Sequence, residues 1–227
     1  MCADDESALA GHLRVLLKRL RPDCVIDVGG NTGQFGRLLR GLGYRGWIVS
    51  FEPVRQSFDR LENFTSGDPR WRVHRLAIGS IPETRRMNVS AMSEFSSFRT
   101  PTTFSLERFR GESEVQHVED VRVVRLDDCE AECLQGIPSS RLFLKVDTQG
   151  WDLEVLRGAA HLIDRCEVLQ VELSLIPVYR GVPMYVETLG YVSRLGFSPT
   201  GFFPITRDEF SRLIEVDCVL VRTLPGY

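Results

Sequence analysis

The stretch from Val25 to Phe35 constrains the fold of this chain more than any other. Residues 24–28 are apolar and β-branched apart from one aspartate, which is typical of a short buried strand. Three glycines follow within five residues, and glycine permits the positive φ that a tight reversal needs. Apolar residues from Phe35 to Leu42 then recur at helical spacing. Strand, glycine loop and helix together predict the opening unit of a nucleotide-binding α/β domain, with its ligand at the carboxyl end of the strand.

The glycine loop argues against two kinds of phosphate site. A dinucleotide fingerprint needs G-x-G-x-x-G, but counting from Gly29 the other two positions hold Asn31 and Gln34. No Gly-Lys-Ser/Thr follows, so the loop is not a P-loop. Its pattern, D-x-G-x-N-x-G, is often seen at S-adenosylmethionine sites. We expect a nucleoside ligand contacted by Asp27, Gly29, Asn31, Gly33 and Gln34, the alternative being a loop that only packs a helix on a strand.

The next two expected strands extend this site toward an adenosine. Residues 47–51 predict the second parallel strand, which ends on Glu52 and Pro53. An acidic residue at this point hydrogen-bonds a ribose diol in Rossmann-like units, and the proline keeps Glu52 out of a helical conformation. The small residues Ala77 and Ile78 follow the third strand, where the loop closes over the base. We expect all four residues to contact the cofactor.

Composition bounds the class of protein. With 227 residues, of which 43% are hydrophobic, one compact α/β enzyme domain is expected. The formal net charge of −3 argues against a nucleic-acid partner. The six cysteines lack metal-site spacing, which favours reduced thiols in a cytoplasmic protein. The acidic N-terminus and the absence of a long apolar run predict neither a signal peptide nor a membrane span. A homodimer stays open.

The order of expected elements predicts the domain organisation. Residues 1–21 form an N-terminal helix, and residues 22–227 form the main domain. Residues 80–120 are irregular and rich in aromatic residues, which suggests a lid or substrate insertion in which Phe95, Phe98 and Phe104 line the acceptor site. Two strands near the C-terminus predict a hairpin after a parallel sheet, as in class I methyltransferases. The expected fold is therefore a Rossmann-like three-layer α/β sandwich with a mostly parallel seven-stranded sheet and an antiparallel last strand.

Two later strands carry the candidate catalytic residues. Lys145 stands inside an apolar strand that ends on Asp147, and a buried ammonium must be paired. Glu172 ends the next strand at the same edge of the sheet. The two carboxylates are either acid/base groups or simply the ion-pair partners of Lys145. No Asp-Asn or Asp-Asp pair follows Asp147, so no obligatory metal is expected.

The chain resembles the FkbM-type methyltransferase family over residues 22 to 222. The resemblance rests on the runs at residues 26–34, 51–53, 77–79, 125–128 and 143–159, with weaker matches at 177–179, 196–197 and 216–218. Two residues depart from the family pattern, Gly30 for alanine and Asp152 for glutamate. The resemblance implies S-adenosylmethionine-dependent O-methylation of a hydroxyl on a small molecule or glycan, such as a sugar, glycolipid or polyketide-like natural product.

An aliphatic hydroxyl is a poor nucleophile, so methyl transfer to it needs a group that accepts the proton. We expect Asp147 to be this group and Glu172 to be the second candidate, with Lys145 orienting or neutralising one of them. The competing hypothesis is a non-catalytic interaction protein that keeps an adenosine pocket. Retention of Asp27, Glu52 and Asp147 argues against it.

Overall fold

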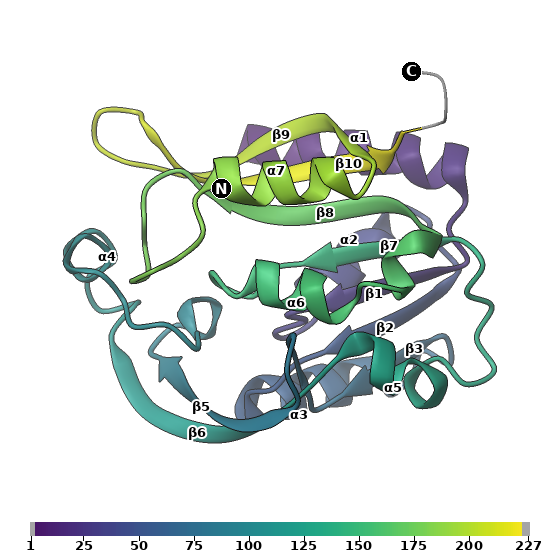
Figure 1. The fold of residues 1–227 in the computed structure, drawn as a ribbon, viewed down its shortest axis with the longest axis horizontal. Coiled ribbons are helices and arrows are strands. Elements are labelled where there is room, and N and C mark those ends of the chain that lie inside the picture. Colours follow the sequence, from purple (N-terminus) through teal and green to yellow (C-terminus); the bar gives the residue numbers. More distant parts are fainter. Residues whose placement is uncertain (1–2, 224–227) are drawn as a thin grey trace.

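A seven-stranded sheet forms the centre of the molecule (Figure 1). The computed structural model describes residues 3–223. The strands of this sheet are β1 (Cys24–Val28), β2 (Trp47–Phe51), β3 (Trp71–His74), β7 (Leu142–Val146), β8 (Cys166–Ser174), β9 (Phe197–Arg207) and β10 (Leu213–Arg222). Their order is β3-β2-β1-β7-β8-β10-β9. All neighbours from β3 to β8 are parallel, and β10 is antiparallel to both β8 and β9. The predicted sheet with its antiparallel last strand is confirmed.

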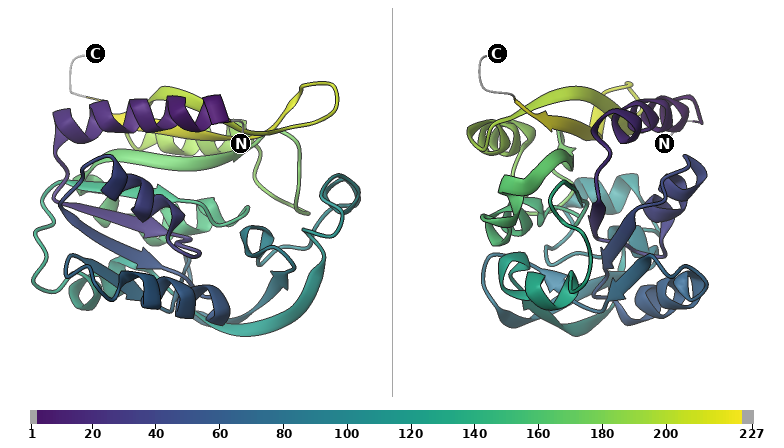
Figure 2. Two further views of the ribbon diagram at one scale, coloured as in Figure 1. Left: turned by 180° about the vertical axis from the view of Figure 1, so that it is seen from behind. Right: turned by 90° about the vertical axis from the view of Figure 1, so that its right-hand side faces the viewer.

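Helices cover both faces of the sheet and make three layers. They are α1 (Ala3–Leu20), α2 (Gln34–Gly41), α3 (Arg55–Thr65), α5 (Leu126–Cys133), α6 (Asp152–Gly158), the short η2 (Leu162–Arg165) and α7 (Tyr185–Arg194). In the right-hand view of Figure 2, α1, α2 and α3 lie on one side of the sheet and α5, α6 and α7 on the other. Among residues 3–223, no helix combines the length and the apolar character needed to cross a membrane.

The face of the sheet under α1 and α2 changes from apolar to polar along each central strand. Side chains alternate across a strand, so residues two apart share a face. Val25 and Phe143 belong to the core cluster under these helices, and Asp27 and Lys145 follow them on the same face. Gln170 lies opposite Lys145 in the register of β7 and β8. A polar floor therefore occupies this face near the carboxyl ends of the parallel strands.

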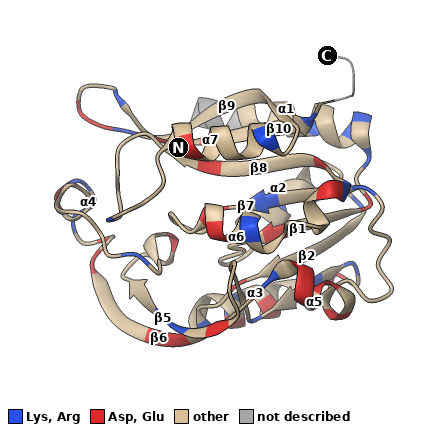
Figure 3. Ribbon diagram, in the orientation of Figure 1, with Lys and Arg blue, Asp and Glu red and all other residues tan. Residues whose placement is uncertain are grey.

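Residues 77–124 form a second, smaller sheet. Its strands are β4 (Ala77–Ile78), β5 (Glu83–Ser90) and β6 (Val115–Val124), in the order β4-β6-β5, with η1 (Ser93–Phe95) and α4 (Thr103–Arg108) between β5 and β6. Both signs of charge occur on this arm (Figure 3), and Arg86 on β5 pairs in register with Asp120 on β6. Much of the segment expected to be irregular is thus regular antiparallel sheet.

The aromatic residues of this insertion divide between two environments. Phe98 lines the cavity described below and lies 5.1 Å from the ring of Trp151. Phe95 and Phe104 pack instead into a small cluster with Phe109 and Tyr179. The expectation that Phe95, Phe98 and Phe104 all line the acceptor site is wrong for Phe95 and Phe104, because they anchor the insertion to the chain around residue 179.

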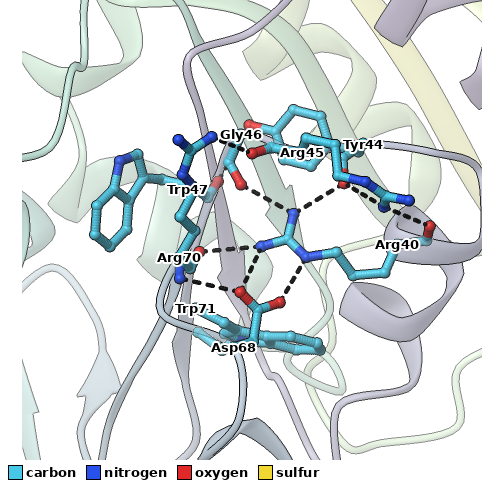
Figure 4. A network of polar contacts seen from close by, with 9 residues as sticks. Arg40, Tyr44, Arg45, Gly46, Trp47, Asp68, Arg70 and Trp71 are labelled. Carbon is cyan, nitrogen blue, oxygen red and sulfur yellow. Dashed lines mark hydrogen bonds and ion pairs between the residues drawn. The ribbon is translucent and has the colours of Figure 1, made fainter.

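The amino ends of the strands are fixed by a guanidinium at the end of α2 (Figure 4). Arg40 pairs with Asp68 at 2.7 Å and donates to the carbonyl oxygens of Tyr44, Gly46 and Arg70 at 2.9–3.1 Å. An Arg fork that satisfies several acceptors at once holds loops in register better than a single contact. This network is structural and leaves the opposite edge of the sheet free for a ligand.

Candidate active site

A cavity of about 400 Å³ opens at the carboxyl ends of the parallel strands. Such an edge is where open α/β sheets bind ligands, and the volume is within the usual range for a small-molecule site. Its walls come from the tips of β1, β2, β4 and β7, the start of α2, the insertion between β5 and β6, and single residues of α1, β8 and β10. Segments far apart in the sequence therefore build one site.

The tips of β1 and β7 are in contact beside the cavity, and this contact explains why residue 29 is a glycine. Gly29 has φ of 84°, and a Cβ at this position would lie 1.8 Å from the carbonyl oxygen of Asp147. The N–H of Gly29 donates to Phe51 O at 3.0 Å, and that of Asp147 donates to Val28 O at 3.0 Å. Only a glycine allows the three strand tips to meet so closely.

Glu52 holds the glycine loop in place from the tip of β2. Its two carboxylate oxygens accept the N–H groups of Asn31 and Val54, each at 2.8 Å. Asn31 has a left-handed φ of 43°, which the Glu52 contact helps to hold. Burial raises the pKa of Glu52 to about 7, although both backbone N–H groups oppose the shift. Each oxygen keeps a second lone pair for a ligand hydroxyl.

Lys145 forms the ionic centre below the strand tips. Its Nζ lies 3.2 Å from Asp27 Oδ1 and 3.3 Å from Asp147 Oδ2, and it donates to the carbonyl oxygen of Gly29 at 3.2 Å. Burial opposes the charge, but the carboxylates of Asp147 and Asp27 outweigh it and raise the pKa of Lys145. The ammonium therefore stays charged and is neutralised inside the protein.

Gln149 joins the two candidate bases. Its Nε2 donates to Asp147 Oδ1 at 3.2 Å and to Glu172 Oε2 at 3.0 Å. Its Oε1 accepts the hydroxyl of the fully buried Tyr179 at 2.8 Å, which fixes the orientation of the amide. The backbone of Gln149 is left-handed at φ 52°, and Ser97 Oγ donates to its carbonyl oxygen at 2.7 Å. The insertion thus clamps the loop that orients Asp147.

Glu172 lies behind this glutamine and not on the cavity. Its side chain contributes instead to a separate crevice beneath the loop after β7. Burial and the nearby Glu215 raise the pKa of Glu172 well above its ordinary value, and burial also raises the pKa of Glu215 to about 8. These two acids differ from Asp147, whose side chain is 38% exposed and reaches the cavity.

The structure brings together most of the residues expected from the sequence. Nine of them line the cavity: Gly29, Asn31, Gln34, Glu52, Pro53, Ala77, Ile78, Lys145 and Asp147. Three do not, which corrects the expectation of direct ligand contact. Asp27 is fully buried against Lys145 and Ser50, Gly33 packs at the start of α2 beside Leu61, and Glu172 is covered by Gln149.

Sequence reasoning missed several polar or aromatic residues of the site, and four of them lie at the tip of β7 or on the strands beyond it. Gln149 and Trp151 line the cavity from the loop after β7, and Gln170 and Asp217 line it from β8 and β10. Gln170 and Asp217 could have been predicted, because each is a polar residue inside an apolar strand, as Lys145 is. Leu9 of α1 could not, since its packing partners are distant in the sequence.

The 3₁₀ turn η1 closes the cavity against the glycine loop. Ser93 Oγ donates to Asn31 Oδ1 at 2.9 Å, and Gln34 Nε2 donates to Glu94 Oε1 at 3.2 Å. These contacts join the insertion directly to the loop expected to hold the cofactor. Movement of η1 would therefore open the cavity above the strand tips.

The charged residues on the cavity wall suit S-adenosylmethionine. Four carboxylates line the cavity, those of Glu52, Glu94, Asp147 and Asp217, against the single ammonium of Lys145. This balance suits a cofactor that carries a sulfonium and an ammonium group against one carboxylate. Together with the strand order, these features define a class I S-adenosylmethionine-dependent methyltransferase.

The chain belongs to the FkbM methyltransferase family, because the profile of the methyltransferase FkbM domain matches residues 27–199. A comparison with curated proteins gives no match. Among solved structures, the chain is similar to fibrillarin from Aeropyrum pernix in complex with S-adenosyl-L-methionine, with a TM-score of 0.51 and 11% identity over 95% of this chain and 74% of the other. It is also similar to magnesium protoporphyrin IX methyltransferase from Synechocystis PCC 6803, with a TM-score of 0.48 and 8% identity over 96% and 80% of the two chains.

Proposed function

We propose that this enzyme methylates a hydroxyl oxygen of a small molecule or glycan, such as a sugar, glycolipid or polyketide-like natural product. The observation that carries the proposal is Asp147, a half-exposed carboxylate on the cavity between the Glu52 end and the sheet's far strands. Bound S-adenosylmethionine supplies an electrophilic methyl group. Membership of the FkbM methyltransferase family supports methyl transfer, and we propose the hydroxyl acceptor in addition.

Glu52 would bind the ribose hydroxyls, and Pro53, Ala77 and Ile78 would enclose the adenine. Gly29, Asn31 and Gln34 would contact the rest of the cofactor. All of these residues lie on the cavity wall. Asp27 and Gly33 act indirectly in this scheme, by fixing Lys145 and the start of α2.

Asp147 would accept the proton of the acceptor hydroxyl as the new bond forms. Lys145 holds one of its oxygens and Gln149 the other, so the carboxylate is fixed in a single orientation. Orientation of reacting groups supplies much of the rate in such a step. Glu172, covered by Gln149, would act through that amide and not on the acceptor.

The substitution Asp147→Asn tests this assignment, because it keeps the shape and removes the basicity. We expect the affinity for S-adenosylhomocysteine to stay within a few-fold of wild type in calorimetry. Methyl transfer to a panel of hydroxylated acceptors should fall by roughly 10²–10⁴, the usual contribution of a positioned base.

Glu172→Gln is the matched variant, since it removes a buried carboxyl that does not reach the cavity. It should reduce turnover far less than Asp147→Asn. Normal turnover in Asp147→Asn combined with loss in Glu172→Gln would reverse the two roles.

A further inference from the structure

The strand tips arrange the site along a line across the sheet. Glu52 follows β2, Gly29 follows β1 and Asp147 follows β7, in the order in which these strands lie. Beyond β7 come β8 and β10, where Glu172 and Asp217 are paired in register. If adenosine occupies the Glu52 end and Asp147 takes the proton, the space over β8 and β10 is left for the acceptor.

This far end of the cavity has an apolar wall and a polar floor. Leu9 of α1 and Leu38 of α2 supply apolar surface, and Phe35 lies beside them. The floor is polar and consists of Gln170 and Asp217, which are only 2% and 8% exposed. Burying polar groups is costly unless they find partners.

Gln170 carries a specific signal of a missing partner. Its Oε1 is buried and has no hydrogen-bond partner among residues 3–223. Nearly all buried polar atoms in proteins are bonded, so an exception in a side chain that lines a cavity requires an explanation. A hydrogen-bond donor on a ligand in the cavity would supply the missing partner.

The charged residues at this end of the cavity disfavour an anionic acceptor. All 26 arginines of the chain lie within the described residues 3–223, and none of them lines the cavity. Lys145 is the one Lys or Arg among the described residues that line it, and it is already paired with Asp27 and Asp147. A phosphate or carboxylate on the acceptor would meet Asp217 and Asp147 with no free cation to offset the repulsion.

Resting on the proposed O-methylation, we propose that the cavity end formed by Leu9, Leu38, Gln170 and Asp217 is the acceptor site, and that it selects an uncharged, hydroxylated ring compound. The ring's hydroxyls donate to Asp217 and Gln170, and its apolar face packs against Leu9 and Leu38. Sugar-like rings combine these two properties, whereas acidic sugars and phosphate esters are excluded.

Three matched ligands test this selection without knowledge of the natural acceptor. They are phenyl β-D-glucopyranoside, phenyl β-D-glucuronide and 2-phenoxytetrahydropyran, which are neutral and hydroxylated, anionic, and free of hydroxyls, respectively. Each is titrated into the complex with S-adenosylhomocysteine and followed by calorimetry and saturation-transfer NMR. The glucoside should bind at least about tenfold more tightly than either of the others, as expected for hydrogen bonds to a charged acceptor.

The variant Asp217→Asn should weaken glucoside binding about tenfold and reduce the discrimination against the glucuronide. Asp164→Asn, at an exposed aspartate of η2, serves as the matched control and should change neither. The affinity for S-adenosylhomocysteine should stay within a few-fold of wild type in both variants, because Asp217 lies at the far end of the cavity from Glu52. If Asp217→Asn does not fold, Gln170→Leu replaces it with the same expected loss of glucoside binding.

Equal or tighter binding of the glucuronide, equal binding of the tetrahydropyran, or no binding of any of the three overturns the proposal. A loss of S-adenosylhomocysteine affinity in a folded Asp217→Asn protein also overturns it, because this end would then belong to the cofactor. Failure of the wild-type protein to bind S-adenosylhomocysteine at all would instead contradict the proposed function.

Discussion

Single residues of this site both hold the fold and line the cavity, and Glu52 is the clearest case. Its carboxylate ties the N–H of Asn31 to the tip of β2, yet it also lines the cavity. Hydrogen bonds to a charged acceptor contribute about 1.5–3 kcal/mol each. Removal of Glu52 should therefore affect both the shape of the glycine loop and the ribose contact that we propose for it.

We expect Glu52→Ala to weaken S-adenosylhomocysteine binding by about 1.5–3 kcal/mol or more, measured by calorimetry. Glu62→Ala is the control, because this exposed glutamate lies on α3 away from the cavity. Unchanged affinity in Glu52→Ala would contradict the assignment of the ribose contact.

At the scale of elements, the close contact between the tips of β1 and β7 restricts which residues the glycine loop can contain. Gly29 and Gly43 both have positive φ, of 84° and 89°. A Cβ at Gly29 would meet the backbone of Asp147 at 1.8 Å, whereas a Cβ at Gly43 has nothing within 4 Å. Alanine substitutions at these two glycines therefore distinguish the free-energy cost of the positive φ from that of the close contact with Asp147.

Gly43→Ala should lower the free energy of unfolding by only about 1–2 kcal/mol, because alanine is strained in a left-handed conformation, and it should keep full cofactor affinity. Gly29→Ala should lower the free energy of unfolding by more than this, because the tips of β1 and β7 must separate. Its binding of S-adenosylhomocysteine should be abolished. Thermal unfolding and calorimetry measure the two effects. Cofactor binding by Gly29→Ala at wild-type affinity would show that the strand tips can move freely.

The insertion between β5 and β6 also makes a prediction at this scale. Its strands form a paired ladder with a buried cluster, so they should be protected from hydrogen exchange in the free enzyme. Residues 91–98, which contact the glycine loop through Ser93 and Glu94, should gain protection when cofactor and acceptor bind. Equal protection of this turn in the free enzyme would make it part of the fixed core and not a lid.

At the scale of the whole molecule, several carboxyl groups are buried. Burial, as the largest cause in each case, raises the pKa of Glu52 and Asp152 to about 7, of Asp217 to about 6 and of Glu215 to about 8. These acids hold protons in the folded protein at pH values where the unfolded chain has released them. Stability should therefore fall as pH rises from about 5 to about 8.

Glu215→Gln checks this expectation, since it removes one of the acids with little change in shape. Its melting temperature should match that of wild type near pH 5 and exceed it by a few degrees near pH 8, each kcal/mol corresponding to about 2–4 °C for a chain of this size. A variant that is less stable than wild type at both pH values would show that the carboxyl group stabilises the fold when ionised.

The sequence by itself determined the class of fold, and it predicted which edge of the sheet carries the cavity. Period-two apolar strands, the glycine loop and a carboxylate after the second strand are local patterns, and their order along the chain predicts a parallel sheet and its ligand edge. Glu52, Asn31 and Ala77, which line the cavity, could be predicted to lie at this edge because each follows a predicted strand within three residues. Lys145 was recognised because an ammonium inside an apolar strand needs a partner.

Only the tertiary structure decided which polar residues face the ligand. Asp27 and Asp147 flank the same lysine, yet one is fully buried and the other reaches the cavity. Glu172 was expected at the edge of the sheet, but Gln149, in a left-handed conformation set by Tyr179 and Ser97, covers it. These outcomes depend on contacts between residues about 25 to 120 positions apart, and the alternation of side chains along one strand carries no information about what packs across from it.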